Sequence, residues 1–245
     1  MTLLILALAS CTGCFLSTLA GGGSPLILIP VLGIFLDSSL VPPVLTVGML
    51  IGNSQRTYLY WNNIDWTLTK WYLPGAIVGS VIGAFIFTKI QFEWLSLVFG
   101  ILLILSTLSY IGKSTKPSFE VQAWYFFPAG MVYAFLSGLV GSMGPILNPF
   151  YLNYGLDKED LIATKAFHMI IVHLVKIIAY IAFGVMTRPT WEYGILLGLA
   201  ALPGNWFGQK ILNQMSTQQF RQMVMSFVGV SGMILVWEQR HIFLP

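Results

Sequence analysis

Two basic side chains lie inside long apolar stretches of the sequence, at positions that correspond to each other. Lys176 follows Arg56 by 120 residues, and no Asp or Glu lies at a comparable depth in either stretch. A cation buried in hydrocarbon without a countercharge costs at least a few kcal/mol, so it should face a polar cavity or a bound anion. Arg56 is close to Trp61, so snorkelling to the membrane interface is its alternative. The pair predicts a site for a small anion.

Two glycine clusters show the same offset of 120 residues. Gly21-Gly22-Gly23-Ser24-Pro25 and Gly141-Ser142-Met143-Gly144-Pro145 each end an apolar run, and a second apolar run follows the proline. Backbone that leaves the helix inside a bilayer is tolerated only within protein or beside a polar cavity. A helix restarted at proline offers N–H groups to an anion, and glycine allows close approach. The alternative is close helix packing alone. We therefore predict these substrate-binding residues: Gly21, Gly22, Gly23, Ser24, Asn53, Arg56, Gly141, Ser142, Met143, Gly144, Asn148, His173 and Lys176.

Two histidines are candidates for proton coupling. His168 and His173 share one face of a predicted helix with Lys165 and Lys176, within an arc of about 140° at about 100° per residue. Histidine titrates near neutral pH, so either residue could carry a coupling proton. The alternative for each is a neutral histidine that is hydrogen-bonded within the packing.

Eight hydrophobic units must position these residues. The pair Gly79/Gly83 in the third unit corresponds to Gly204/Gly208 in the seventh, and we expect both pairs to allow close helix contact. The fold class is therefore an all-α polytopic membrane protein with two structural repeats, 1–115 and 116–245. Each repeat holds one Gly/Pro-broken helix and three transmembrane helices. The units span residues 3–20 with a restart at 25–36, then 41–61, 70–88, 94–111, 121–140 with a restart at 145–154, 161–186, 191–210 and 220–237.

The distribution of Lys and Arg favours broken helices that enter the membrane and return as hairpins. If both broken helices cross the membrane fully, the basic residues divide five against five. The hairpin arrangement agrees better with the positive-inside rule and puts both termini outside the cytoplasm. With hairpins, seven basic residues face three: Lys70, Lys113, Lys116, Lys158, Lys165, Lys210 and Arg221 against Lys89, Arg188 and Arg240.

The composition excludes several classes of protein. The chain is 56% hydrophobic and 9% charged, whereas soluble domains carry about 25% charged residues, so a multi-pass protein of the plasma (inner) membrane is expected. The net charge of +3 gives no reason to expect nucleic acid. Cys11 and Cys14 lie in the first apolar run without partner cysteines, so we expect no metal site and no cofactor. The first apolar run lacks a basic start and is not expected to be a cleaved signal peptide. Nucleotide-binding and hydrolase motifs are absent from the sequence, so no enzymatic role is expected.

The sequence resembles the TauE/SafE sulfite exporter family, also called the TSUP transporters. The resemblance is carried by the run from Ala20 to Leu32, its repetition near Gly141 to Pro149, and the pattern Pro74-Gly75-xxx-Gly79-xxx-Gly83. It covers nearly the whole chain and implies secondary transport of a sulfur-containing anion such as sulfite, a sulfonate like sulfoacetate, or thiosulfate. The second glycine cluster departs from the family pattern, which more often has several adjacent glycines there.

The function we expect is secondary transport of a small anion by alternating access around a midplane site. An anion channel and a carrier of a non-sulfur organic anion are the alternatives, and a membrane enzyme or an assembly factor is a third class. The expected partners are the small anionic substrate and the lipid bilayer. A coupling proton and a second copy of the chain in a homodimer are further candidates.

Overall fold

Helices are the only regular secondary structure over the residues that the chain's computed structural model describes, and no strand occurs among them. These residues are 1–37, 39–89, 101, 104, 120–142 and 146–238. The predicted all-α class is therefore confirmed for this part of the chain. The predicted fourth hydrophobic unit and the linker between the halves lie outside the described residues, apart from isolated positions.

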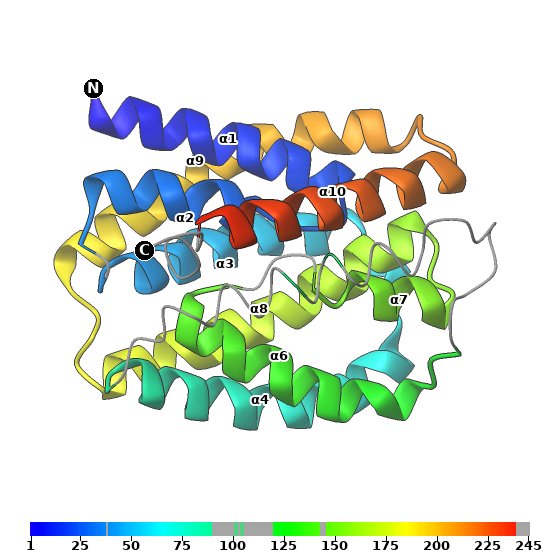
Figure 1. Ribbon diagram of the computed structural model, residues 1–245, viewed down its shortest axis with the longest axis horizontal. Coiled ribbons are helices and arrows are strands. Elements are labelled where there is room, and N and C mark those ends of the chain that lie inside the picture. Colours follow the sequence, from blue (N-terminus) through cyan, green and yellow to red (C-terminus); the bar gives the residue numbers. More distant parts are fainter. Residues whose placement is uncertain (38, 90–100, 102–103, 105–119, 143–145, 239–245) are drawn as a thin grey trace.

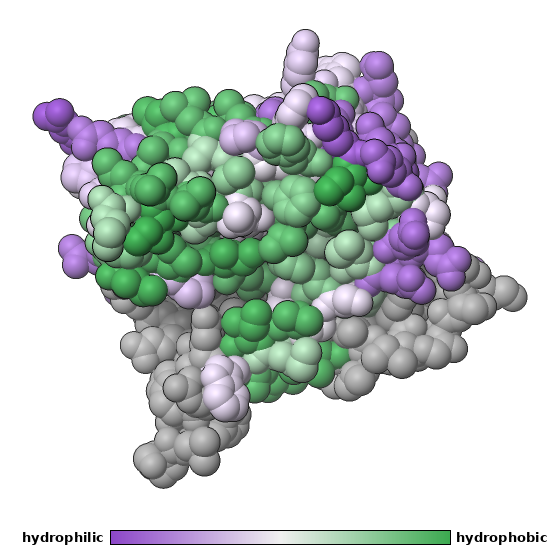
Figure 2. All heavy atoms as spheres, turned by 90° about the horizontal axis from the view of Figure 1, so that it is seen from above, coloured by the Kyte–Doolittle hydropathy of each residue, from purple (hydrophilic) through white to green (hydrophobic). Residues whose placement is uncertain are grey.

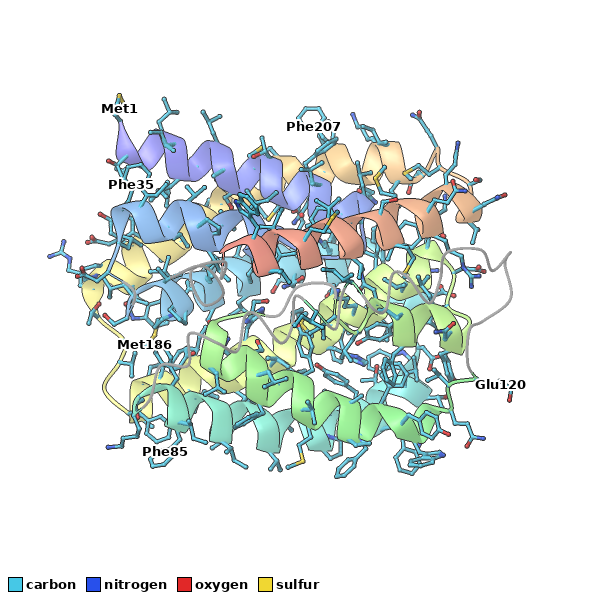
Figure 3. The ribbon with its side chains drawn as sticks, viewed as in Figure 1. Met1, Phe35, Phe85, Glu120, Met186 and Phe207 are labelled. Carbon is cyan, nitrogen blue, oxygen red and sulfur yellow. The ribbon has the colours of Figure 1, made fainter. Side chains whose placement is uncertain are left out.

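The first broken unit forms a helical hairpin. Helix α1 (Thr2–Leu19) and helix α2 (Ser24–Phe35) are joined by a short glycine turn. Met1 and Phe35 lie at the same end of the molecule (Figure 3), so α2 returns to the end from which α1 starts. Both arms begin and end within one residue of the prediction. The chain continues through α3 (Val41–Leu59), η1 (Trp61–Asn63) and α4 (Trp66–Phe87).

The second broken unit approaches from the opposite end of the molecule. Helix α6 starts on the side where Glu120 lies, and α7 lies on that same side (Figures 1 and 3). The described part of the second arm is short, because α7 begins at Asn148 and residues 143–145 lie outside the described ranges. The bounds are η2 (Ala123–Tyr125), α6 (Phe126–Val140), α7 (Asn148–Tyr154), α8 (Lys158–Ala182), α9 (Arg188–Leu212) and α10 (Thr217–Glu238).

Glycines allow close helix contacts, as predicted. A side chain at Gly79 or Gly83 would overlap the carbonyl groups of α6, and one at Gly204 would overlap the carbonyl of Cys11 in α1. Thus α4 packs on the first arm of the second hairpin, and α9 packs on the first arm of the first hairpin. Helices α3 and α8 contact each other and lie between these two pairs (Figure 1).

The outer surface is that of a membrane protein. Within the described ranges, three helices are long and apolar enough to cross a membrane, namely α1, α4 and α8. Figure 2 shows a broad apolar face, on the side of Figure 1 where α1 and α9 lie, with hydrophilic residues gathered toward its ends. Leu4, Leu8, Leu199 and Phe207 are among the large exposed apolar side chains of these two helices. Exposed apolar surface of this extent is stable in lipid.

Candidate functional site

A small cavity lies beside the first glycine turn. Its volume is about 40 Å³, and its walls come from α1, α2, α3, α6 and α8 together with both glycine clusters. Helices from both halves of the chain therefore form one site. The lining residues are Ser17, Gly21, Gly22, Gly23, Ser24, Pro25, Met49, Asn53, Arg56, Tyr133, Ser142, Ile162, Lys165, Ala166, Met169 and His173.

The turn needs its three glycines for conformational reasons. Gly21, Gly22 and Gly23 have φ values of +65°, +124° and +118°, a region that other L-residues rarely adopt. Gly22 donates its N–H to the carbonyl of Ser17 at 2.6 Å, which ends α1. Helix α2 then begins with Pro25 in its first turn, so its N-terminus lies at the cavity. The first N–H groups of a helix lack intrahelical acceptors and favour an anion.

Lys165 of α8 supplies a cation directly at this turn. Its Nζ donates to the carbonyl oxygen of Gly21 at 2.7 Å and to Oδ1 of Asn148 at 2.6 Å. The side chain is 6% exposed, and it lies against Gly22 so closely that a Cβ there would overlap the ammonium. The positive-inside count places Lys165 on one side of the membrane. The structure corrects this, because Lys165 is buried within α8. The hairpin topology then has six basic residues on one side of the membrane and three on the other.

Arg56 of α3 also lines the cavity and is held by two other helices. Its Nε donates to Oγ1 of Thr18 at 3.2 Å and to Oδ1 of Asn205 at 3.0 Å, and its Nη2 donates to the carbonyl of Cys14 at 3.2 Å. These contacts fix the guanidinium beside the last turns of α1. Snorkelling to the interface does not describe its position, since only 7% of the residue is exposed.

Two polar atoms of the lining residues have no hydrogen-bond partner among the described residues. They are Nδ1 of His173 and Oγ of Ser17, and both residues are 1% exposed. Buried polar atoms normally have partners, so a water molecule or a ligand in the cavity would complete this pair. No acidic side chain lines the described part of the cavity.

Lys176 and His168 are both fully buried, and neither lines the cavity. Lys176 donates from Nζ to the carbonyls of Ser137 and Gly141, at the end of α6. His168 is bonded through its ring nitrogens to the hydroxyls of Tyr151, at 2.8 Å, and Thr69, at 3.0 Å, and it stacks on Tyr72. Lys176 therefore binds the end of helix α6. His168 is a histidine that is hydrogen-bonded within the packing, which is the alternative to proton coupling.

The structure thus brings together most of the residues predicted from sequence. Asn148 does not line the cavity but bonds Lys165 and donates to the carbonyl of Ala20. Gly141 contributes its carbonyl to Lys176 rather than to the cavity. Met143 and Gly144 lie outside the described residues. The eight predicted residues that line the cavity are Gly21, Gly22, Gly23, Ser24, Asn53, Arg56, Ser142 and His173.

Sequence reasoning missed Lys165 and Ser17 as members of the site. Lys165 has a signal in the sequence, because it lies eight residues before His173 on the same helical face. Ser17 stands one turn before the glycines, where a hydroxyl on an apolar helix usually bonds its own backbone. The described residues contain no cluster of His, Cys, Asp and Glu that could hold a metal ion.

Comparisons with known proteins give one match. The family model described as "Sulfite exporter TauE/SafE" matches residues 5–235 of the 245 residues. No curated protein and no solved structure matches the chain significantly.

Proposed function

The chain belongs to the sulfite exporter TauE/SafE family, and we propose that it is a secondary transporter of a small sulfur-containing anion. The family model covers nearly the whole chain, so the coarse conclusion of a membrane transporter rests on family membership. The cavity beside the first glycine turn is the proposed binding site.

The observation that carries the proposal is the chemistry of this cavity. Lys165 and Arg56 provide two positive charges, and Ser17 and His173 provide buried polar atoms that have no partner among the described residues. The N-terminus of α2 adds the positive end of a helix dipole. Because the described lining has no carboxylate, a bound anion is the group that balances these charges.

The size of the cavity favours a compact oxyanion. A water molecule needs about 10–15 Å³ of such space, so the cavity of about 40 Å³ takes about three water-sized groups. Three oxygens around one sulfur, as in sulfite, match this number. Thiosulfate is slightly larger, whereas sulfoacetate carries a carboxymethyl arm on its sulfonate that the cavity does not accommodate in this state.

Alternating access between two inverted repeats, 1–115 and 116–245, is the proposed mechanism. In its support, the two hairpins approach the centre from opposite ends of the molecule (Figure 1), and each first arm packs on the glycine helix of the other half. The cavity lies between elements of both halves, so rocking of one half against the other would open it to alternate sides. In this scheme His173, which lines the cavity, is the histidine placed to carry a coupling proton.

Flux into liposomes tests the function. The purified protein is reconstituted, and uptake of sulfite, thiosulfate, sulfate, sulfoacetate and lactate is compared with uptake by Lys165→Met. We expect saturable uptake that is fastest for sulfite and thiosulfate and is lost in the variant. Uptake that rises linearly with concentration would indicate a channel, and a preference for lactate would indicate a carrier of non-sulfur organic anions.

Cysteine labelling tests the inverted arrangement. In a protein with Cys11→Ser and Cys14→Ser, single cysteines replace Leu36, Gln122 or Met186. The first and last positions should be labelled from one side of the membrane and Gln122 from the other, because Phe35 and Met186 lie opposite Glu120 (Figure 3). Labelling of Gln122 and Met186 from the same side would contradict the hairpin topology and indicate parallel halves, because a second broken unit that crosses the membrane fully would move Met186 to the side of Gln122.

A further inference from the structure

Lys165 connects the two halves of the molecule at the point where the anion is proposed to bind. We propose that Lys165 is a latch: in the empty protein it holds the first glycine turn, and an anion in the cavity takes over its ammonium and releases the turn. This inference rests on the proposed function, since it concerns the same cavity. It assigns Lys165 a role in coupling anion binding to movement of the α1–α2 hairpin.

Three hydrogen bonds form the link. Lys165 donates to the carbonyl of Gly21 and to Oδ1 of Asn148, and Asn148 donates from Nδ2 to the carbonyl of Ala20 at 3.1 Å. Two consecutive carbonyls at the end of α1 are therefore bound by side chains of α7 and α8. Carbonyls at a helix C-terminus carry partial negative charge, so a buried ammonium stabilises them.

The anion must compete for the same donors. An ammonium has three N–H donors, and at least two of them are already directed at the protein oxygens of Gly21 and Asn148. The full charge of an anion attracts the ammonium more strongly than the partial charge of a carbonyl oxygen does. An anion at the cavity wall therefore draws the ammonium away from Gly21, and the turn loses its link to α8.

The surroundings differ at Gly141, in the described part of the second glycine turn. A Cβ on Gly141 would meet Pro42 and Leu45 of α3, which are apolar and offer nothing to an anion. The end of α6 is instead bound by Lys176 and by Tyr180, whose hydroxyl donates to the carbonyl of Gly138 at 3.1 Å. Neither donor lines the cavity. Anion binding should therefore loosen the first hairpin and leave the second one in place.

Hydrogen exchange of the full-length protein in nanodiscs tests the latch directly. Exchange is followed in peptides covering residues 19–26 and 136–142, in the wild type, Lys165→Met and Lys176→Met, with and without sodium sulfite. Without anion, Lys165→Met should raise exchange of the first turn about tenfold and leave the second unchanged, because a charged hydrogen bond is lost. Lys176→Met should show the opposite pattern.

Addition of sulfite to the wild type separates a latch from a purely structural lysine. A latch predicts faster exchange of residues 19–26 on binding, up to the level of Lys165→Met without anion. Slower or unchanged exchange would overturn the proposal, and so would a folded Lys165→Met protein with normal protection of this turn. If Lys165→Met does not fold, Lys165→Gln is read in the same way. Wild-type protein that transports no anion would defeat the proposed function, whereas the exchange without anion tests the link at Gly21 separately.

Discussion

The two glycine turns of this protein occupy corresponding places and differ in what faces them. Lys165 faces the first turn, and Leu45, the residue 120 positions earlier, faces the second. The first turn therefore has a cation, a cavity and unpartnered polar atoms beside it. In the described part of the second turn, Gly141 meets apolar side chains, and Ser142 lines the cavity. Gly21 and Gly141, at corresponding positions, both have a positive φ, but different side chains face them.

Arg56 and Lys176, the two cations at corresponding positions, can also be compared. Arg56 and Lys176 both bind carbonyls near the end of the first arm of their own hairpin. Their shared task is to hold an interrupted helix in place. Only Arg56 also reaches the cavity, since Asn205 and Thr18 hold it there. In the proposed function, the difference between Lys165 and Leu45 is the reason why the anion binds at the first turn.

The largest expected effect comes from removing the charge at the first turn. Lys165→Met should lower anion transport in liposomes about a hundredfold, because a charged hydrogen bond contributes up to about 3 kcal/mol and about 1.4 kcal/mol is a factor of ten. Leu45→Met, at the corresponding position, should transport within about twofold of the wild type. An equal loss of transport in both variants would contradict the proposal that only the first turn binds the anion.

A side chain at Gly22 should be nearly as harmful. Gly22→Ala adds a Cβ that overlaps the Lys165 ammonium at a φ of +124°, and a total cost of about 2 kcal/mol would lower transport about thirtyfold. Gly155→Ala is the matched control, because its φ is +102° and its Cβ would meet open space. If both alanine variants transport equally poorly, backbone strain alone accounts for the effect.

Substitutions of Lys176 and Arg56 should affect different properties: the first only the melting temperature, the second both the melting temperature and the anion affinity. Lys176→Met should lower the melting temperature by about 5 °C, since its two carbonyl acceptors lose a charged donor, and should leave anion affinity within about threefold. Arg56→Met should lower the melting temperature and also weaken anion binding about tenfold. Thermal melts and titration with sulfite measure both quantities. A tenfold loss of affinity in Lys176→Met would return that residue to the site.

The smallest expected effect concerns two serines at corresponding positions. Ser17→Ala should weaken anion binding about fivefold, because its hydroxyl lies at the cavity and a hydrogen bond to an anion is lost. Ser137→Ala should leave the affinity unchanged, since Ser137 is buried but does not line the cavity. Titration of both variants with sulfite measures the difference, which disappears if the anion binds elsewhere.

Much of the fold was predictable, because apolar runs and glycine-proline pairs mark where helices begin and end. The break at Gly21–Gly23 and the close contacts at Gly79 and Gly204 were found this way. The site was predictable in part. Lys165 was missed because it is the eighth residue of α8 and resembles an interfacial lysine in sequence. It is buried because the glycine turn of the first hairpin lies against the start of that helix, with Gly21 beside Leu161 and Gly22 beside Lys165.

The sequence by itself determined that the backbone must break twice inside an apolar environment and that cations must lie buried nearby. Only the tertiary structure decided which cation meets which turn. Lys165 and Lys176 share one face of α8, but eleven residues separate them by about 16 Å along the helix. Periodicity gives the direction of a side chain, whereas the ends of the two hairpins, which lie beside different parts of α8, give its partner. Lys165 therefore meets the first turn, and Lys176 meets the end of α6.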